Sequence, residues 1–236
     1  MTEVVLTETF AAARARLAAA LAAAGRDPQD AALLAVSKTK PALMIREAHG
    51  LGQRQFGENY LQEAIDKQAE LADLDDIVWH FIGPLQSNKT RQVAEHFDWV
   101  HSVDREKIAR RLAEQRPADR APLNVCLQVN ISDEASKAGV ALADLDALAE
   151  TVMSLPGLRL RGLMAIPAPS ADPAEQRLPF KRLREALEAL KARFPEAALD
   201  TLSMGMSDDL EAAIAEGATL VRIGTALFGA RPRPTT

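Results

Sequence analysis

The sequence predicts a single-domain (β/α)8 barrel preceded by an extra N-terminal helix. Short β-rich runs alternate with longer helical runs after Gly25, and eight such strands can be identified. They occupy roughly 200 residues, which suits a barrel fold that is typically about 250 residues long. A doubly wound open sheet is the alternative. It usually has fewer strands, and its nucleotide-binding form needs a glycine-rich first turn, which residues 37–41 do not provide.

The elements follow one another along the chain. Residues 10–24 form the predicted N-terminal helix, because Phe10, Leu17 and Leu21 continue one helical stripe and Gly25 is a natural stop. The strands are predicted at residues 33–37, 54–57, 78–83, 99–103, 123–130, 160–166, 201–204 and 220–224.

Period-two alternation in the fifth strand places Asn124, Cys126 and Gln128 on the face that we expect to point into the barrel. The clearest helical stripe runs through residues 180–194, with apolar residues three and four apart. The proline-rich residues 167–179 are expected to form a long loop before it.

No linker or change of composition divides the chain. We therefore expect one domain over residues 1–236, with the helix and its lead-in at 1–30, the barrel at 31–230 and a tail at 231–236.

Composition excludes several classes of function. The 236 residues are 47% hydrophobic and 26% charged, an ordinary globular balance. A net charge of −5 and the lack of a long basic run argue against nucleic acid as a partner, and no apolar run is long enough to span a membrane. The single cysteine, Cys126, cannot form an internal disulfide, which favours a reducing compartment, and so we expect a cytoplasmic protein.

Lys38 is the most informative residue, because it follows the apolar first strand and precedes a proline that opens a helix. A lysine at the mouth of a packed strand can be desolvated, which lowers its pKa and exposes a neutral amine suited to forming a Schiff base with an aldehyde. A solvated lysine at a strand end is the plainer interpretation, and on its own it would be favoured.

The ends of the seventh and eighth strands carry groups that suit a phosphate. Ser207 is a predicted N-cap of the helix that begins at Leu210, and a serine with free amides at a helix start can hold an anion. Gly224 lets the backbone approach a ligand closely, and Thr225 adds a hydroxyl. Phosphate sites in such barrels commonly lie after strands seven and eight. A simple cap and a turn glycine remain the alternative for each residue alone.

Arg222 shares a strand face with Gly224, so it is predicted to point into the barrel. It could pair with a core carboxylate, or it could face a ring nitrogen of a cofactor. A lysine for an aldehyde, a phosphate site and an arginine for a heteroaromatic nitrogen together describe pyridoxal 5′-phosphate (PLP). The protonated arginine would disfavour a proton on the ring nitrogen, which weakens the ring as an electron sink.

No histidines pair at metal-ligand spacing, and no cluster of cysteine and histidine occurs, so a structural zinc site is not expected. His80 and His101 fall on adjacent predicted strands and could line the site, although a buried core histidine is the plainer interpretation for each.

The sequence resembles the pyridoxal phosphate homeostasis proteins, a family similar to the N-terminal barrel domain of alanine racemase, a fold-type III PLP barrel. The matching stretches span almost the whole chain after the first helix. They are AVSKTKP (35–41), FGENYLQE (56–63), WHFIGPLQSNK (79–89), HSVD (101–104), QVNISDEASKAGV (128–140), RGLMAIP (161–167), LSMGMSDDLEAAI (202–214) and VRIGTALFGAR (221–231).

The resemblance implies that Lys38 carries PLP as an internal aldimine and that Arg222 lies near the pyridine nitrogen. It implies that Ser207, Gly224 and Thr225 contact the phosphate. The further cofactor-binding residues expected on this basis are Asn59, His80, Met164 and Ser203, with Lys137 as an accessory residue near the opening of the site.

The resemblance also implies a carrier that holds PLP and delivers it to apo-enzymes. A PLP-dependent racemase-like enzyme of low activity is the alternative, and a lysine aldolase without cofactor is a weaker one. Racemisation needs a base on each face of the substrate carbon. Alanine racemases bring a tyrosine from an added β-domain, whereas Tyr60 is the only tyrosine here. We therefore expect no efficient racemisation. We also expect a monomer.

Overall fold

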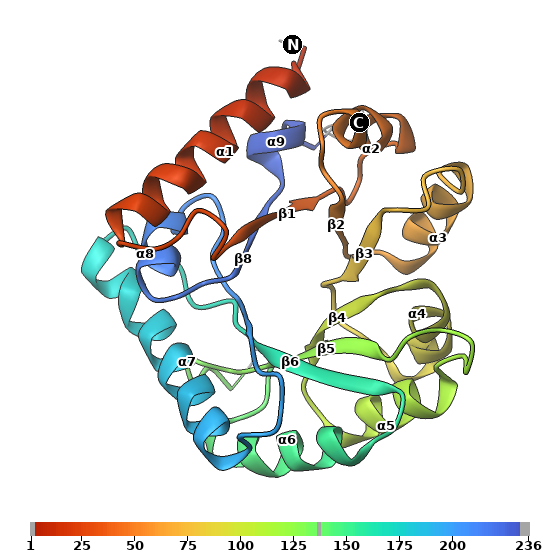
Figure 1. The fold of residues 1–236 in the computed structure, drawn as a ribbon, viewed down its shortest axis with the longest axis vertical. Coiled ribbons are helices and arrows are strands. Elements are labelled where there is room, and N and C mark those ends of the chain that lie inside the picture. The colour runs from red at the N-terminus through yellow and green to blue at the C-terminus, as the bar shows by residue number, and fades with distance from the viewer. Residues whose placement is uncertain (1–2, 136–137, 232–236) are drawn as a thin grey trace.

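Parallel strands form a closed barrel surrounded by helices (Figure 1). The computed structural model describes residues 3–135 and 138–231. Within them the strands are β1 (Ala32–Val36), β2 (Gln55–Glu58), β3 (Val78–Phe81), β4 (Trp99–Val103), β5 (Leu123–Gln128), β6 (Leu158–Met164), β7 (Thr201–Ser203) and β8 (Leu220–Ile223). Each strand pairs in parallel with the next, and β8 pairs with β1 to close the ring. The predicted fold class is confirmed.

The helices lie outside this ring. They are α1 (Leu6–Ala23), α2 (Ala42–Gly50), α3 (Leu61–Glu70), α4 (Thr90–His96), α5 (Glu106–Gln115), α6 (Leu145–Ser154), α7 (Pro173–Arg193), α8 (Leu210–Ala215) and α9 (Thr225–Phe228), with 3-10 turns η1 (Ser87–Lys89) and η2 (Leu142–Asp144). The predicted bounds of β4 are confirmed, and those of the other strands differ from the structure by one or two residues.

The core has two parts, because strand side chains alternate between the helices and the barrel interior. On β5, Leu123, Val125 and Leu127 are fully buried in the large apolar core that the helices cover. Cys126 instead packs with Trp99 inside the barrel. The predicted inward direction of the Cys126 set is therefore confirmed.

Two local predictions are wrong. Residues 173–179 are not loop, because Asp172 accepts a hydrogen bond from the Ala174 amide (2.9 Å) and Pro173 occupies the first helical turn, where a missing N–H costs little. Ser207 does not cap α8. The residue before that helix is Asp209, whose carboxylate accepts a hydrogen bond from the Met206 amide at 2.7 Å and so shapes the loop after β7.

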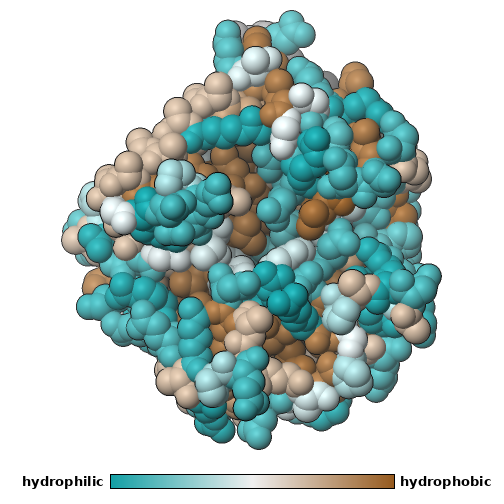
Figure 2. Space-filling model, viewed as in Figure 1, coloured by the Kyte–Doolittle hydropathy of each residue, from teal (hydrophilic) through white to brown (hydrophobic). Residues whose placement is uncertain are grey.

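Helix α1 begins at Leu6, earlier than predicted, and packs beside α8 and α9. Thr9 donates a hydrogen bond to the Leu227 carbonyl (2.8 Å), and the Phe10 and Phe228 rings meet edge to face at 5.8 Å. The solvent side of this alanine-rich helix forms a weakly hydrophobic band on an otherwise largely hydrophilic face (Figure 2). Within the described residues, no helix is long and apolar enough to cross a membrane.

Candidate functional site

A cavity of about 390 Å³ opens at the carboxyl ends of the strands, where barrels of this kind form their sites. Six of the predicted cofactor-binding residues line it. They are Lys38, Asn59, Ser207, Arg222, Gly224 and Thr225, which come from the ends of β1, β2, β7 and β8. Residues far apart in the sequence therefore meet in one cavity, which we call the mouth cavity.

Lys38 lies two residues after β1 and is half-buried in the wall of the mouth cavity. Burial of its amine lowers the pKa of Lys38, and the positive charge of Arg231 lowers it further. Both effects favour the neutral form of the amine, which is the form that reacts with a carbonyl carbon.

A buried charged cluster holds the backbone before Lys38. Lys67 Nζ donates to the carbonyl of Ser37 at 2.8 Å and to Oε1 of Glu58 at 2.7 Å. Ser37 Oγ donates to the same Glu58 oxygen at 2.8 Å. Glu58 is fully buried and Lys67 is 5% exposed, so these bonds are shielded from water and strengthened by the low local dielectric.

The same cluster holds the backbone after Lys38. The Thr39 amide donates to Oε1 of Glu63 at 2.6 Å, and that carboxylate lies 3.0 Å from Lys67 Nζ. Thr39 has a φ of 68°, a left-handed conformation that a β-branched residue adopts only under constraint. Lys67, Glu58 and Glu63, which we call the Lys67 cluster, therefore fix both neighbours of Lys38.

Ser207, Gly224 and Thr225 gather on the side of the mouth cavity formed by the loops after β7 and β8. A Cβ on Gly224 would lie 3.4 Å from the carbonyl oxygen of Val36 on β1, so the β8 end passes close to the strand that leads to Lys38. Two hydroxyls and a glycine backbone at this place suit an anionic oxygen cluster such as a phosphate.

Arg222 lines the mouth cavity and is 5% exposed. Its Nη1 donates to Ser203 Oγ at 2.7 Å and its Nη2 donates to the Ala165 carbonyl at 3.0 Å. Burial lowers the pKa of Arg222 to about 10, partly offset by the negative charge of Asp209. The guanidinium is therefore protonated at neutral pH, and its geometry leaves other N–H groups for a ligand.

Three further predicted residues, His80, Met164 and Ser203, do not line the mouth cavity. His80 is fully buried and stacks on Trp99 with ring centroids 5.2 Å apart. Met164 packs beside Trp99 in the barrel interior, and Ser203 accepts a hydrogen bond from Arg222. Lys137 lies outside the described residues. Direct contacts from these residues to a cofactor stay predictions.

Several lining residues were not predicted. They are Val36, Thr39, Lys40, Ile82, Ile166, Met206, Asp208, Gly229 and Arg231. Ile82 lies two residues after His80 on the same inward face, a signal that alternation could have given. The sequence predicts that Arg231 belongs to a tail, and nothing in its local pattern indicates that the chain returns to the mouth cavity. It returns because Lys40 Nζ donates to the Ala230 carbonyl at 2.9 Å.

Two buried polar atoms of residues that line the mouth cavity form no hydrogen bond within the described residues. They are Oδ1 of Asn59 and Oγ1 of Thr39. Buried polar atoms are normally satisfied, so these two atoms fit a ligand that supplies polar groups. Among residues 3–135 and 138–231, no three His, Cys, Asp or Glu side chains gather where they could hold a metal ion.

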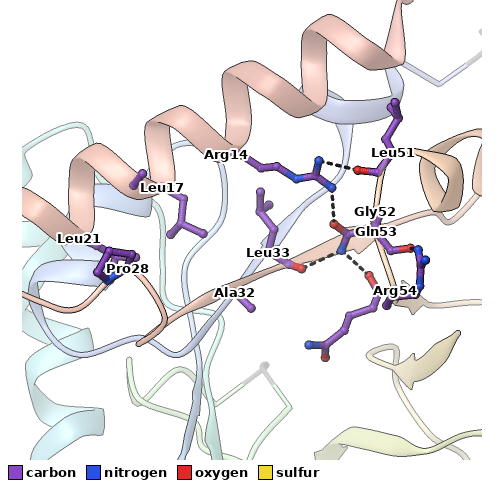
Figure 3. A pocket seen from close by; sticks show the side chains of 12 residues that line it. Arg14, Leu17, Leu21, Pro28, Ala32, Leu33, Leu51, Gly52, Gln53 and Arg54 are labelled. Atoms are coloured by element: carbon purple, nitrogen blue, oxygen red, sulfur yellow. Dashed lines mark hydrogen bonds between the residues drawn. The ribbon is translucent and has the colours of Figure 1, made fainter. Parts of the chain in front are cut away.

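A second cavity, of about 480 Å³, lies between α1 and the amino ends of β1 and β2 (Figure 3). The side chains of Gln53 and Arg14 in its wall bind to the protein itself. Gln53 donates to the carbonyls of Leu33 (2.9 Å) and Gln55 (2.8 Å), and Arg14 donates to the carbonyl of Leu51 at 2.8 Å. Although this cavity, which we call the lower cavity, is larger than the mouth cavity, the mouth cavity has the Lys38 amine of lowered pKa and the two unpartnered atoms, so it is the candidate site.

The sequence profile of the alanine racemase N-terminal domain family matches residues 10–232. A pyridoxal phosphate homeostasis protein of Pseudomonas aeruginosa is 68% identical over 226 residues, which cover 96% of both proteins. Another, from Escherichia coli strain K12, is 57% identical over 228 residues, covering 96% of this chain and 97% of the relative.

Solved structures show the same architecture. PipY of Synechococcus elongatus PCC7942, in the structure with PLP bound, superposes with a TM-score of 0.80 at 45% identity and covers 90% of this chain and 100% of its own. Alanine racemase from Corynebacterium glutamicum superposes with a TM-score of 0.65 at 16% identity, covering 94% of this chain and 61% of the racemase. At that identity the likeness concerns the fold alone.

Proposed function

The chain belongs to the pyridoxal phosphate homeostasis protein family, and we propose on that basis that it binds PLP in the mouth cavity and acts as a carrier or reservoir of the cofactor. One observation carries the proposal. The desolvated amine of Lys38 shares a cavity with the hydroxyls of Ser207 and Thr225 and with the guanidinium of Arg222.

Lys38 supplies the covalent attachment. Its neutral amine nitrogen attacks the aldehyde carbon of PLP, one water molecule leaves, and a Schiff-base linkage joins the two. The Lys67 cluster holds Ser37 and Thr39, so the base of the Lys38 side chain has a fixed position relative to the rest of the cavity.

The other lining residues suit the rest of the cofactor. Ser207, Gly224 and Thr225 would hold the phosphate, and Asn59 would supply its unpartnered oxygen. Arg222 would donate a hydrogen bond to the pyridine nitrogen. When bound, PLP supplies an electron sink, and a protonated arginine at that nitrogen makes it a weak one.

The site suits retention of PLP better than amino-acid turnover. Racemisation needs an acid–base group on each face of the substrate carbon, and Lys38 supplies one. Tyr60 is 46% exposed and does not line the mouth cavity within the described structure. This supports a carrier from which apo-enzymes receive PLP. We further propose that it works as a monomer in the cytoplasm, where Cys126 would stay a free thiol.

Absorption spectroscopy tests the proposal. The purified protein incubated with PLP should show the visible band of a Schiff base, which Lys38→Ala should lack. Lys107→Ala, which changes an exposed lysine on α5, should keep the band. A wild type that takes up no PLP would contradict the proposal. Faster delivery of PLP to an apo-enzyme from the loaded protein than from free PLP would support the carrier role. Rapid turnover of alanine enantiomers would favour the racemase alternative.

A further inference from the structure

A continuous series of hydrogen bonds crosses the inside of the barrel below the mouth cavity. Arg222 Nη1 donates to Ser203 Oγ at 2.7 Å, and Ser203 Oγ lies 2.7 Å from Nδ1 of His101. His101 Nε2 lies 2.8 Å from Nδ1 of His80, and His80 Nε2 lies 2.8 Å from Oε1 of Gln55. We call these five residues the interior network.

The interior network connects strands that are not neighbours. His101 is on β4 and Ser203 is on β7, and these strands lie apart in the closed ring. Their contact therefore joins opposite walls of the barrel. At its far end, Gln55 borders the lower cavity, while Arg222 borders the mouth cavity.

The two ends set the direction of every bond in the network. Arg222 can only donate, and the Gln55 oxygen can only accept. His80 must then carry its proton on Nε2, which leaves its Nδ1 to accept from Nε2–H of His101. Nδ1 of His101 in turn accepts the Ser203 hydroxyl proton, so a Ser203 lone pair faces Arg222. In the opposite direction Ser203 would accept from both neighbours, and its own proton would have no acceptor in the network.

Burial keeps the two histidines neutral, as this direction requires. His80, His101 and Ser203 are all fully buried. Desolvation lowers the pKa of His80 to about 3, and desolvation with the nearby His80 and the positive charge of Arg222 lowers the pKa of His101 well below its usual value. Each neutral imidazole then has one donor and one acceptor nitrogen. Neither ring takes up a second proton at neutral pH, which would turn its acceptor nitrogen into a donor.

We propose that Gln55, His80, His101 and Ser203 are positioning residues that hold Arg222 for the cofactor by presenting a fixed hydroxyl lone pair to its guanidinium. Ser203 Oγ and the Ala165 carbonyl anchor two different nitrogens of the rigid fork, so they set its plane as well as its place. This inference rests on the proposed function, because Arg222 is the residue that faces the ring nitrogen of PLP there.

The direction of the network is tested without any cofactor. In the double variant His49→Gln/His96→Gln, only His80 and His101 remain of the four histidines, and long-range ¹H–¹⁵N NMR at pH 7 reports their tautomers. Both should be neutral with the proton on Nε2. A proton on Nδ1 of either ring, or a charged ring, would overturn the assigned direction. This result does not depend on whether the protein binds PLP.

The positioning role is tested with two substitutions at Ser203. Ser203→Ala removes the acceptor and leaves a buried charged donor unpaired, so we expect roughly tenfold weaker PLP binding and a displaced absorption band. Ser203→Thr keeps the hydroxyl and should restore both. Equal affinities and identical bands in the wild type and Ser203→Ala would overturn the role, whatever the variant does to stability. A wild type that fails to bind PLP would instead contradict the proposed function, and the positioning role with it.

Discussion

Lys67 and Glu58 form a buried ion pair, with 2.7 Å between Nζ and Oε1, and both partners hydrogen-bond to Ser37, the residue that precedes Lys38. Its side chains are 6% and 0% exposed. Such a pair contributes little net stability relative to apolar packing, but it requires both partners. The pair serves to fix the backbone beside Lys38, because Lys67 also donates a hydrogen bond to the Ser37 carbonyl.

Removing Lys67 should therefore destabilise the protein strongly. Lys67→Met leaves the Glu58 carboxylate buried without its cation, and we expect the free energy of unfolding to fall by about 3 kcal/mol. Urea denaturation measures this change. The control is Lys107→Met, which alters an exposed lysine on α5. A loss no larger than that of the control would contradict a structural role for the pair.

Gly83 should be essential for the shape of the mouth cavity. A Cβ at this position would lie 2.5 Å from the carbonyl oxygen of Asn59 and 2.9 Å from its Cα, so Gly83→Ala must push the Asn59 backbone away. We expect at least tenfold weaker PLP binding in a titration. Gly50→Ala is the matched control, because nothing lies within 4 Å of a Cβ there. If Gly83→Ala bound PLP with wild-type affinity, the position of Asn59 would not contribute to PLP binding.

Arg231 should set the pH at which Lys38 reacts. Burial lowers the pKa of Lys38 first, and the positive charge of Arg231 lowers it further. Arg231→Gln removes that charge, so the pKa of Lys38 should rise and less neutral amine should be present at pH 7. Stopped-flow attachment of PLP should become slower, and its pH–rate profile should move to higher pH. An unchanged profile would mean that Arg231 does not act on this amine.

His80 should make the fold sensitive to acid. Burial lowers the pKa of His80 from the usual 6.5 to about 3, so below pH 6.5 the unfolded chain takes up a proton that the folded protein does not. The contribution of His80 to the free energy of unfolding is fully present above pH 6.5 and is lost as the pH falls. The loss is about 2 kcal/mol between pH 7 and pH 5.

The comparison of the wild type with His80→Gln isolates this contribution. Burial raises the pKa values of Glu58 and Asp209, which gives an opposite pH dependence, but those groups are present in both proteins. The difference in unfolding free energy between the two proteins should therefore change by about 2 kcal/mol between pH 7 and pH 5. If the difference is the same at both pH values, His80 is not held neutral by burial.

The sequence predicts the barrel and much of the mouth cavity because both depend on local patterns. Alternation in β5 identifies its inward face, and the position of Lys38 and Arg222 at strand ends places them at one rim. The prolines near Pro179 predict a loop, and this prediction is wrong because the cap at Asp172 and the buried face of α7 favour helix.

What the sequence could not predict are contacts between distant elements. Lys67 looks like an ordinary lysine on a polar helix, and only the packing of α3 against β2 buries it beside Glu58. The contact of His101 with Ser203 depends on the width and register of the closed barrel, because β4 and β7 do not pair.

Borohydride reduction of the PLP-loaded protein, followed by peptide mapping, identifies the lysine to which PLP is attached. Reduction converts the Schiff base to a stable amine, so mass spectrometry locates the attached lysine. We expect modification of Lys38 at close to one equivalent, with Lys40 unmodified although it lines the same cavity. Modification of Lys40 or of a surface lysine, with Lys38 unmodified, would contradict attachment at Lys38.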